Sequence, residues 1–306
     1  MNSIKYDIDF VLPWVNPNDK AWIQLYTKYS IKNKRDIRVN GSRWRDWGLL
    51  RYVFRGIDKY MPWIRNVYLI LAAESQYEGW MNKNNIKVIY HKDIIPKSLL
   101  PVFNSCAIEM FLHNIPGLSE HFLYSNDDIY ITDYCMPEDF FTDGLPNIKM
   151  RTLPYSASNN MFRHQCANSQ DLVRTDGRTS ERLGYIYKNF HSISPLLKSV
   201  CKKIHTDNEI AIYNSISQFR EAKNINQYVY LYYMYFNNMY ADKIWNFRYT
   251  SFSDNTQEEI FEFIKNRKQQ VLCINDAGYK GKLTYTKLLF KSAFQNILPK
   301  ESKYEN

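Results

Sequence analysis

Apolar runs and amphipathic stretches alternate through the first 135 residues of the chain. The apolar runs predict buried strands over 8–15, 66–73 and 86–91. Between them, apolar residues at helical spacing predict helices over 43–61 and 105–115. Because parallel neighbouring strands need crossover connections, this alternation predicts an α/β fold with a largely parallel, Rossmann-like sheet flanked by helices.

The second half of the chain has a different pattern. It is irregular over 136–176 and then mostly helical in spacing. The predicted helices are 195–204, 207–217, 225–240 and 254–272, the last opened by a capping box of Asp254 and Gln257. We therefore predict an α/β nucleotide-sugar-binding core over 1–135 and a mainly helical half over 136–306, which packs on the core and completes the site within one continuous catalytic domain.

Two adjacent acids interrupt the apolar stretch 122–131, where Ser125 and Asn126 precede Asp127 and Asp128. We interpret this stretch as a buried strand that ends in two carboxylates. Such a pair is costly to hold unless it is neutralised, and the usual partner is a hard divalent cation with oxygen ligands. The same residues also suit a plain turn after a strand. Ligands of open α/β sheets bind beyond the carboxyl ends of the strands, so the acids and the turn at 14–19 are expected to face one cleft.

Composition narrows the possible partners. Hydrophobic residues make up 45% and aromatic residues 16% of the 306, which is typical of a globular protein. The net charge of +9 indicates acidic partners, but Lys and Arg are dispersed, which disfavours nucleic acid. Phosphorylated small molecules, an anionic polymer and an anionic membrane surface remain as alternatives.

The cysteines and the apolar runs give information about the cellular compartment of the protein. The five cysteines are odd in number and widely spaced, a pattern that favours reduced cytoplasmic thiols over a disulfide framework or a zinc site. The N-terminus lacks the features of a signal peptide, and no apolar run reaches the ~20 residues that span a bilayer. We expect a soluble or peripheral protein.

Several familiar catalytic motifs are absent from the sequence. It has no Walker P-loop, no G-x-G-x-x-G, no H-E-x-x-H and no G-x-S-x-G, which excludes the common NTPases, classical dinucleotide enzymes, zinc proteases and α/β-hydrolases. What remains is the Asp pair, a distant Asn275–Asp276 pair, isolated histidines and several arginines. This set suits chemistry on a phosphorylated substrate, in which Mg²⁺ or Mn²⁺ bridges phosphate oxygens and Arg forms bidentate contacts.

Four blocks of sequence together resemble the four ordered regions of the Stealth family. They are IDFVLPWVNPNDKAW at 8–22, the long block 43–131, HSISPLLKSV at 191–200 and CINDAGYKG at 273–281. The family contains bacterial capsular polysaccharide phosphotransferases and the animal lysosomal-enzyme N-acetylglucosamine-1-phosphotransferase. Its first region usually reads W-V-D-G-x-D, whereas Asn16 and Pro17 replace the Asp-Gly here, and Pro17 lacks an N–H and fixes the turn.

The resemblance implies a glycosyltransferase A-like sheet and a specific reaction. A hexose 1-phosphate, such as N-acetylhexosamine 1-phosphate, passes from a UDP-sugar to an acceptor hydroxyl of a capsular or surface polysaccharide, a phosphodiester forms, and UMP leaves. It implies Mg²⁺ or Mn²⁺, a cytoplasmic bacterial enzyme, and peripheral association with capsule assembly machinery at the inner face of the membrane. Two rivals stay open: a metal-dependent glycosyltransferase that releases UDP, and a non-catalytic glycan-binding module.

The resemblance also implies catalytic and metal-binding roles. Asp127 and Asp128 match the family's Asp-Asp motif and, with Asn275 and Asp276, would hold the metal; Asp127 would also be catalytic. His191 matches the family histidine and would be the general base for the acceptor hydroxyl, because histidine changes charge near neutral pH. A core or helix-capping histidine is its structural alternative.

Further residues would bind the donor. Arg220 would be catalytic and would clamp the diphosphate, although a surface salt bridge also explains it. The other implied nucleotide-sugar contacts are Trp14, Val15, Asn16, Asp19, Arg45, Arg51 and Asn104. Plain core packing explains Trp14 equally well. A solvated helix face and an N-cap are the alternatives for the two arginines and for Asn104.

Overall fold

A five-stranded sheet forms the centre of the computed structural model, which describes residues 6–35, 44–156 and 160–306. The strand order is β10-β4-β1-β2-β3. The parallel strands are β1 (Ile8–Pro13), β2 (Val67–Leu71), β3 (Ile86–Tyr90) and β4 (His121–Tyr124), and β10 (Ser194–Leu197) runs antiparallel to β4. The order 3-2-1-4 is the first part of the doubly wound order 3-2-1-4-5-6. The predicted α/β fold with a largely parallel sheet is therefore confirmed.

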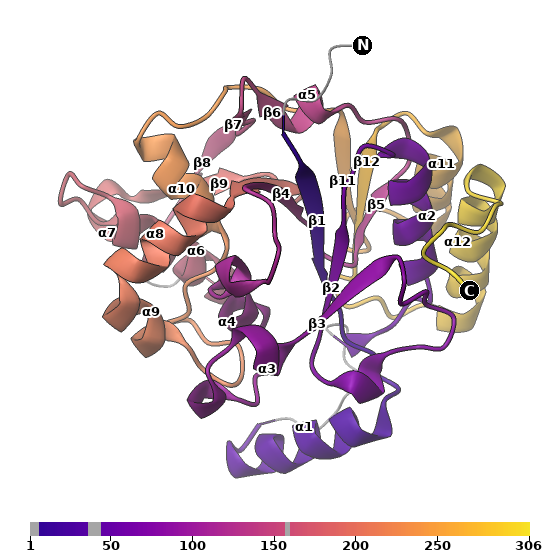
Figure 1. The fold of residues 1–306 in the computed structure, drawn as a ribbon, viewed down its shortest axis with the longest axis horizontal. Helices are drawn as coiled ribbons and strands as arrows, with labels where there is room; N and C mark the ends of the chain where they lie inside the picture. The colour runs from indigo at the N-terminus through magenta and orange to yellow at the C-terminus, as the bar shows by residue number, and fades with distance from the viewer. Residues whose placement is uncertain (1–5, 36–43, 157–159) are drawn as a thin grey trace.

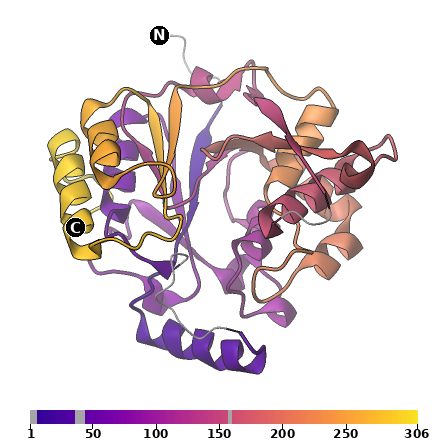
Figure 2. The ribbon, with the colours of Figure 1, turned by 180° about the vertical axis from the view of Figure 1, so that it is seen from behind.

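Helices cover both sides of the central strands (Figures 1 and 2). On one side lie α2 (Leu50–Tyr60), α11 (Gln257–Asn266) and α12 (Leu283–Ile297). On the other lie α4 (Ser105–Glu109), α6 (Met161–Val173), α8 (Lys198–Asp207), α9 (Glu209–Ser215) and α10 (Tyr228–Phe236). Helix α1 (Lys20–Lys32) lies at one end of the molecule, and the short helices are α3 (His91–Ile94), α5 (Pro137–Phe140) and α7 (Ser180–Leu183).

A second sheet begins directly after the acid pair. Its order is β11-β12-β5, with β5 (Ile129–Ile131) antiparallel to β12 (Val271–Asn275) and parallel pairing between β12 and β11 (Phe247–Ser251). Helix α2 packs closely on β5, because a Cβ at Gly56 would lie 2.6 Å from the carbonyl oxygen of Ile131. The smaller pairs are β6 (Phe141–Thr142) with β7 (Leu145–Pro146), and β8 (Met150–Pro154) with β9 (Tyr185–Asn189).

Several predicted elements differ from the structure. The stretch 122–131 is two strands in two sheets rather than one strand. The helix predicted over 43–61 is the shorter α2, and residue 43 lies outside the described residues. The segment 195–204 starts as edge strand β10, where Pro195 pairs with Leu123, and becomes helical only at Lys198. A strand edge tolerates proline because no ladder donor is needed there.

The predicted capping box is also wrong by two residues. The Thr256 hydroxyl accepts from the Glu259 N–H, and the Glu259 carboxylate accepts from the Thr256 N–H at 2.8 Å. Helix α11 then ends at Asn266 instead of reaching Leu272, because the chain continues as strand β12. Hydrophobic spacing alone did not separate this short buried strand from the end of a helix.

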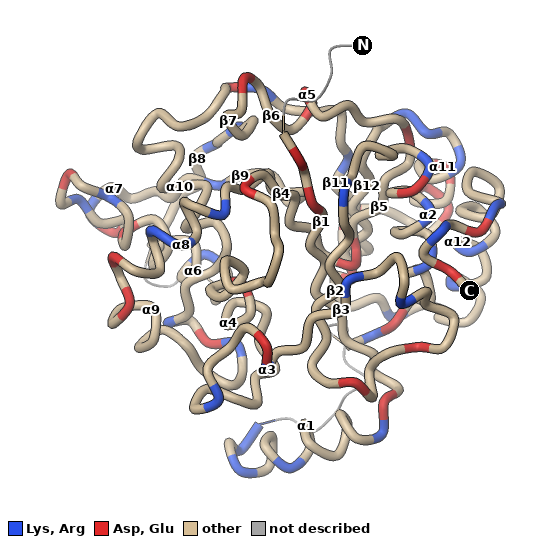
Figure 3. The backbone as a smooth tube through the Cα atoms, viewed as in Figure 1, with Lys and Arg blue, Asp and Glu red and all other residues tan. Residues whose placement is uncertain are grey.

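All five cysteines are buried and free, in agreement with the predicted absence of disulfides. Within the described ranges, every helix is too short or too polar to cross a bilayer. Lys and Arg are spread over most elements, as Figure 3 shows, in agreement with the dispersed basic charge of the sequence.

A buried ion pair ties the C-terminal segment to helix α2. The Glu305 side chain has no exposed surface and accepts from Arg55 through both oxygens, at 2.8 and 2.9 Å. Arg51 adds a third contact at 3.0 Å. Burial opposes ionisation of Glu305, but the hydrogen bonds from Arg55 and Ser302 outweigh it and lower its pKa to about 2. The pair therefore holds its charge at neutral pH.

We expect Glu305→Gln to lower the free energy of unfolding at pH 7 by about 3 kcal/mol, because it leaves Arg55 buried without its counter-charge. The folded pKa of about 2 lies below the ordinary 4.5, so this stability is present above pH 4.5 and is lost as the pH falls towards 2. Urea unfolding of both proteins between pH 7 and 3 measures the difference. Glu301→Gln, at an exposed position of the same segment, is the control. An unchanged midpoint in Glu305→Gln would contradict this account.

Candidate active site

A cavity of about 600 Å³ opens beyond the carboxyl ends of β1 and β4. After β1, the chain contributes Trp14 and Val15 to its lining. After β4, it contributes Asn126, Asp127 and Asp128. These strand ends face one cleft, as expected from the general rule for open α/β sheets.

Asp128 is held from several sides through one carboxylate oxygen. Its Oδ2 lies 3.4 Å from Nε2 of His191, 3.4 Å from Nδ2 of Asn275 and 3.7 Å from Sγ of Cys273. Its own carbonyl accepts from the N–H of Ile274 at 2.8 Å. Burial alone would raise the pKa of Asp128, but the contacts from His191 and then Asn275 outweigh it and lower the pKa. Asp128 is therefore ionised at neutral pH.

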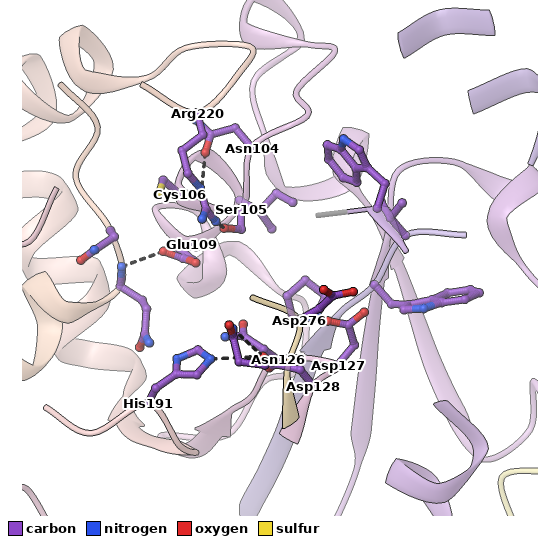
Figure 4. Close-up of a pocket in the computed structure, with 18 of the residues that line it drawn as sticks. Asn104, Ser105, Cys106, Glu109, Asn126, Asp127, Asp128, His191, Arg220 and Asp276 are labelled. Carbon is purple, nitrogen blue, oxygen red and sulfur yellow. Dashed lines mark hydrogen bonds and ion pairs between the residues drawn. The ribbon is translucent and has the colours of Figure 1, made fainter. Parts of the chain in front are cut away.

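The remaining carboxyl oxygens are suited to a cation. The other oxygen of Asp128, Oδ1, is buried and accepts no hydrogen bond from any described residue. The Asp127 carboxyl faces the cavity, where water reaches it although protein encloses its other sides (Figure 4). That enclosure and the neighbouring Asp128 raise the pKa of Asp127 to about 7. Two adjacent carboxyls with an unpartnered buried oxygen fit a divalent ion with oxygen ligands.

The C-terminal pair Asn275–Asp276 reaches the same cavity but is differently engaged. The Asn275 amide contacts Asp128, whereas Asp276 forms an ion pair with Arg45 at 2.7 Å. The other oxygen of Asp276 accepts from the N–H groups of Gly278 and Tyr279 at 3.1 and 3.0 Å. The structure thus brings all four predicted metal residues to one cavity, with Arg45 already opposite Asp276.

A second donor set was not predicted from the sequence. Ligand atoms of Asp128, His191 and Cys273 lie within 4.8 Å of one another. Burial raises the pKa of the Cys273 thiol well above its ordinary value, as does the nearby Asp128. The thiol therefore stays protonated and donates to Asp128. The oxygen atoms of the two aspartates suit Mg²⁺ or Mn²⁺, whereas a thiolate would suit a softer metal.

The facing wall of the cavity is built on helix α4 and the loop that carries Arg220 (Figure 4). Arg220 donates to the hydroxyl of Ser105. Asn104 is the N-cap of α4, since its side chain accepts from the Cys106 N–H at 3.1 Å, and it also lines the cavity. Buried Glu109 accepts from the Gln227 N–H at 2.8 Å. Burial raises the pKa of Glu109, although Arg220 opposes the shift.

Three predicted nucleotide contacts lie outside the cavity lining, namely Asn16, Asp19 and Arg51. The backbone N–H of Asn16 donates to Gln76 at 2.8 Å, and Asp19 caps helix α1 and accepts from Ser75. Arg51 pairs with Glu305. All three positions have partners within the protein, whereas Trp14, Val15, Arg45 and Asn104 line the cavity. The donor-binding role of all seven residues stays a prediction.

Other cavity residues were missed by the sequence analysis. Lys188, Phe162, Gln227 and Tyr249 all line the cavity. They come from β9, α6, the start of α10 and β11, which are distant in sequence and carry no recognisable motif. The one feature of the sequence that could have indicated Lys188 as a cavity residue is its position three residues before His191.

We expect Asp127→Asn to raise the free energy of unfolding by about 1 kcal/mol at pH 8 in EDTA, a value discounted for screening by cavity water. Asp127 titrates at about 7 in the folded protein against an ordinary 3.8, so its ionisation costs stability as the pH rises through this interval. The gain should disappear near pH 4. Thermal unfolding measures it, with Asp242→Asn at an exposed surface pair as the control. A variant less stable than the wild type at pH 8 would refute this electrostatic account.

Comparison with known proteins places the chain in a family. The model of Stealth protein conserved region 1 matches residues 6–34, and that of conserved region 2 matches residues 43–148. An exopolysaccharide phosphotransferase of Lactiplantibacillus plantarum is 31% identical over 98% of this chain and 96% of its own. A receptor polysaccharide phosphotransferase of Streptococcus gordonii is 30% identical over 97% of this chain and 98% of its own. A crystal structure of the galactosyltransferase LgtC matches 94% of this chain and 95% of its own at 13% identity, with a TM-score of 0.41. The chain belongs to the Stealth family and is a transferase enzyme.

Proposed function

We propose that the chain transfers a hexose 1-phosphate from a UDP-sugar to a hydroxyl of a polysaccharide acceptor and releases UMP. One observation carries the proposal: in a Stealth chain, His191 contacts one oxygen of Asp128 while the other oxygen is buried and unpartnered at the cavity. A base and a cation-binding carboxylate are thereby fixed next to each other. This is what attack of a hydroxyl on a phosphate requires.

Asp127 and Asp128 would hold a divalent ion through the free Oδ1 and the Asp127 carboxyl, with Asn275 alongside. When bound, such an ion neutralises charge on the donor's phosphate oxygens. The Asp127 carboxyl gives up its proton more readily in the presence of a cation, because the like-charge repulsion from Asp128 is then offset. The acid pair is therefore suited to a cation–phosphate complex rather than to proton transfer.

His191 acts on the acceptor. Its Nε2 faces Asp128, so an N–H at that position leaves Nδ1 free to accept the proton of the acceptor hydroxyl. The acceptor oxygen forms a bond to the phosphorus next to the sugar, and the bond from that phosphorus to the bridging oxygen breaks. The electron pair of the broken bond stays on UMP. Asp128 stabilises the imidazolium that results.

Arg220 supplies positive charge from the facing wall. It contacts Ser105 and lies near the buried Glu109. A guanidinium in this position is suited to the donor diphosphate, which would lie between Arg220 and the acid pair.

Identification of the released nucleotide tests the proposal. Purified protein is incubated with a panel of UDP-sugars, Mn²⁺ and oligosaccharide acceptors. We expect UMP, its loss on addition of EDTA, and a decrease of at least ~10²-fold in Asp127→Ala and in His191→Ala, the range for removal of a catalytic acid–base group or a metal ligand.

Asp242→Asn is the matched control and should retain full activity, since this exposed carboxylate pairs with Lys149 and is not part of the cavity lining. Thermal unfolding of each variant verifies that it is folded. Release of UDP instead of UMP would make the chain a glycosyltransferase. Undiminished UMP release in His191→Ala would remove this residue from the proton-transfer role.

A further inference from the structure

The wall of the cavity next to His191 carries a lysine that the reaction above does not use. Lys188 lies on strand β9, lines the cavity and is half-buried, with its ammonium 5.0 Å from the centre of the Phe162 ring. Among the described residues, its ammonium has no carboxylate partner. A half-buried cation without a counter-charge, placed in a cavity, is a candidate contact for an anionic ligand.

A second cation stands directly opposite Lys188 across the strand pair. Arg151 on β8 is its register partner, and directly opposed residues of antiparallel strands project from the same face. Like charges directly opposite each other destabilise a strand pair, so a contribution to folding does not explain why Lys188 and Arg151 face each other. Arg151 is exposed, lies over the Phe190 ring at 5.1 Å and forms no ion pair with a described residue.

The surrounding charge adds to this local excess of positive potential. Burial lowers the pKa of the Lys188 ammonium, and the neighbouring Arg151 and Arg163 lower it further. Arg163 comes from helix α6, where it donates to the carbonyl of Pro154 at the end of β8. Two strands and a helix thus bring two arginines near Lys188, which itself lines the cavity.

We propose that Lys188 and Arg151 bind a phosphodiester of the acceptor chain, so that the preferred acceptor is itself a phosphate-containing polysaccharide. The inference rests on the proposed function. Lys188 lies in the cavity three residues before His191, the base for the acceptor hydroxyl, and Arg151 is exposed beside it on the same face of the strand pair. The two cations therefore mark a path from the reacting hydroxyl to solvent. An extended anionic polymer fits such a path, while a compact nucleotide sugar does not need it.

Binding without turnover tests the inference. The probes are a hexose trisaccharide joined by phosphodiesters, the same trisaccharide joined by glycosidic bonds, and UDP. We expect the phosphodiester probe to bind the wild type about tenfold more tightly than the neutral one at low salt, and this preference to fall as salt is raised. Titration calorimetry in the presence of EDTA gives the three dissociation constants.

Two variants remove the cations separately. Lys188→Met keeps the aliphatic stem on Phe162, and Arg151→Gln changes an exposed side chain, so the second retains the fold even if the first does not. We expect each to weaken phosphodiester binding about fivefold, with unchanged binding of UDP and of the neutral probe. Lys203→Met, at an exposed ion pair on α8, is the matched control and should leave all three constants unchanged.

Equal binding of the charged and neutral trisaccharides, or unchanged phosphodiester binding in both variants, would overturn the inference. Loss of UDP binding in Lys188→Met would also overturn it, because the lysine would then belong to the donor site. Failure of the wild type to release UMP in the nucleotide assay would instead contradict the proposed function. Binding and nucleotide release are separate measurements, so the two proposals fail independently.

Discussion

The position of the acid pair depends on a change of sheet within four residues. The chain leaves the central sheet at Tyr124 and enters the second sheet at Ile129. At one end, the Ser125 N–H donates to Val11 of β1 at 3.0 Å; at the other, the carbonyl of Asp128 accepts from Ile274 at 2.8 Å. Both ends of the crossing are thus fixed by backbone hydrogen bonds to different sheets. The crossing so fixed carries Asp127 and Asp128, and both line the cavity.

Much of the fold was predictable because it follows local pattern. Strands β1, β2 and β4 are mostly apolar runs buried on both faces, and β3 is a shorter apolar run with Lys87 exposed. Such runs are recognisable from the local sequence alone. Strand β10 and the first two residues of β12 were assigned to helices, since a short apolar run next to a helix has no period of its own. Pairing with β4 and β5 decides their conformation. That pairing joins residues at least 70 positions apart along the chain, and such distant pairing cannot be recognised from local pattern.

The residues of the candidate site were predictable only in part. Acidic pairs at strand ends and the resemblance to a known family indicated the residues that do gather at the cavity, including Asp127 and His191. The predictions for Asn16, Asp19 and Arg51 did not anticipate their partners. Those partners, among them Gln76, Ser75 and Glu305, lie at least 56 positions away and satisfy the side chains in the folded protein. Polar residues that stabilise a turn or a helix have the same composition as residues that bind a ligand.

The crossing between the sheets has a consequence for biosynthesis. Within the described part of the chain, strand β5 pairs with β12 alone. A ribosome must therefore have completed residue 275 before Asp128 can acquire its contacts with Ile274 and Asn275. A nascent chain that holds the whole central sheet up to β4 still has an unpaired β5 edge and two unsupported carboxylates. The candidate site is therefore completed only after the chain has been synthesised to residue 275, and a chain released before that point lacks these contacts even where the strands β1 to β4 have folded.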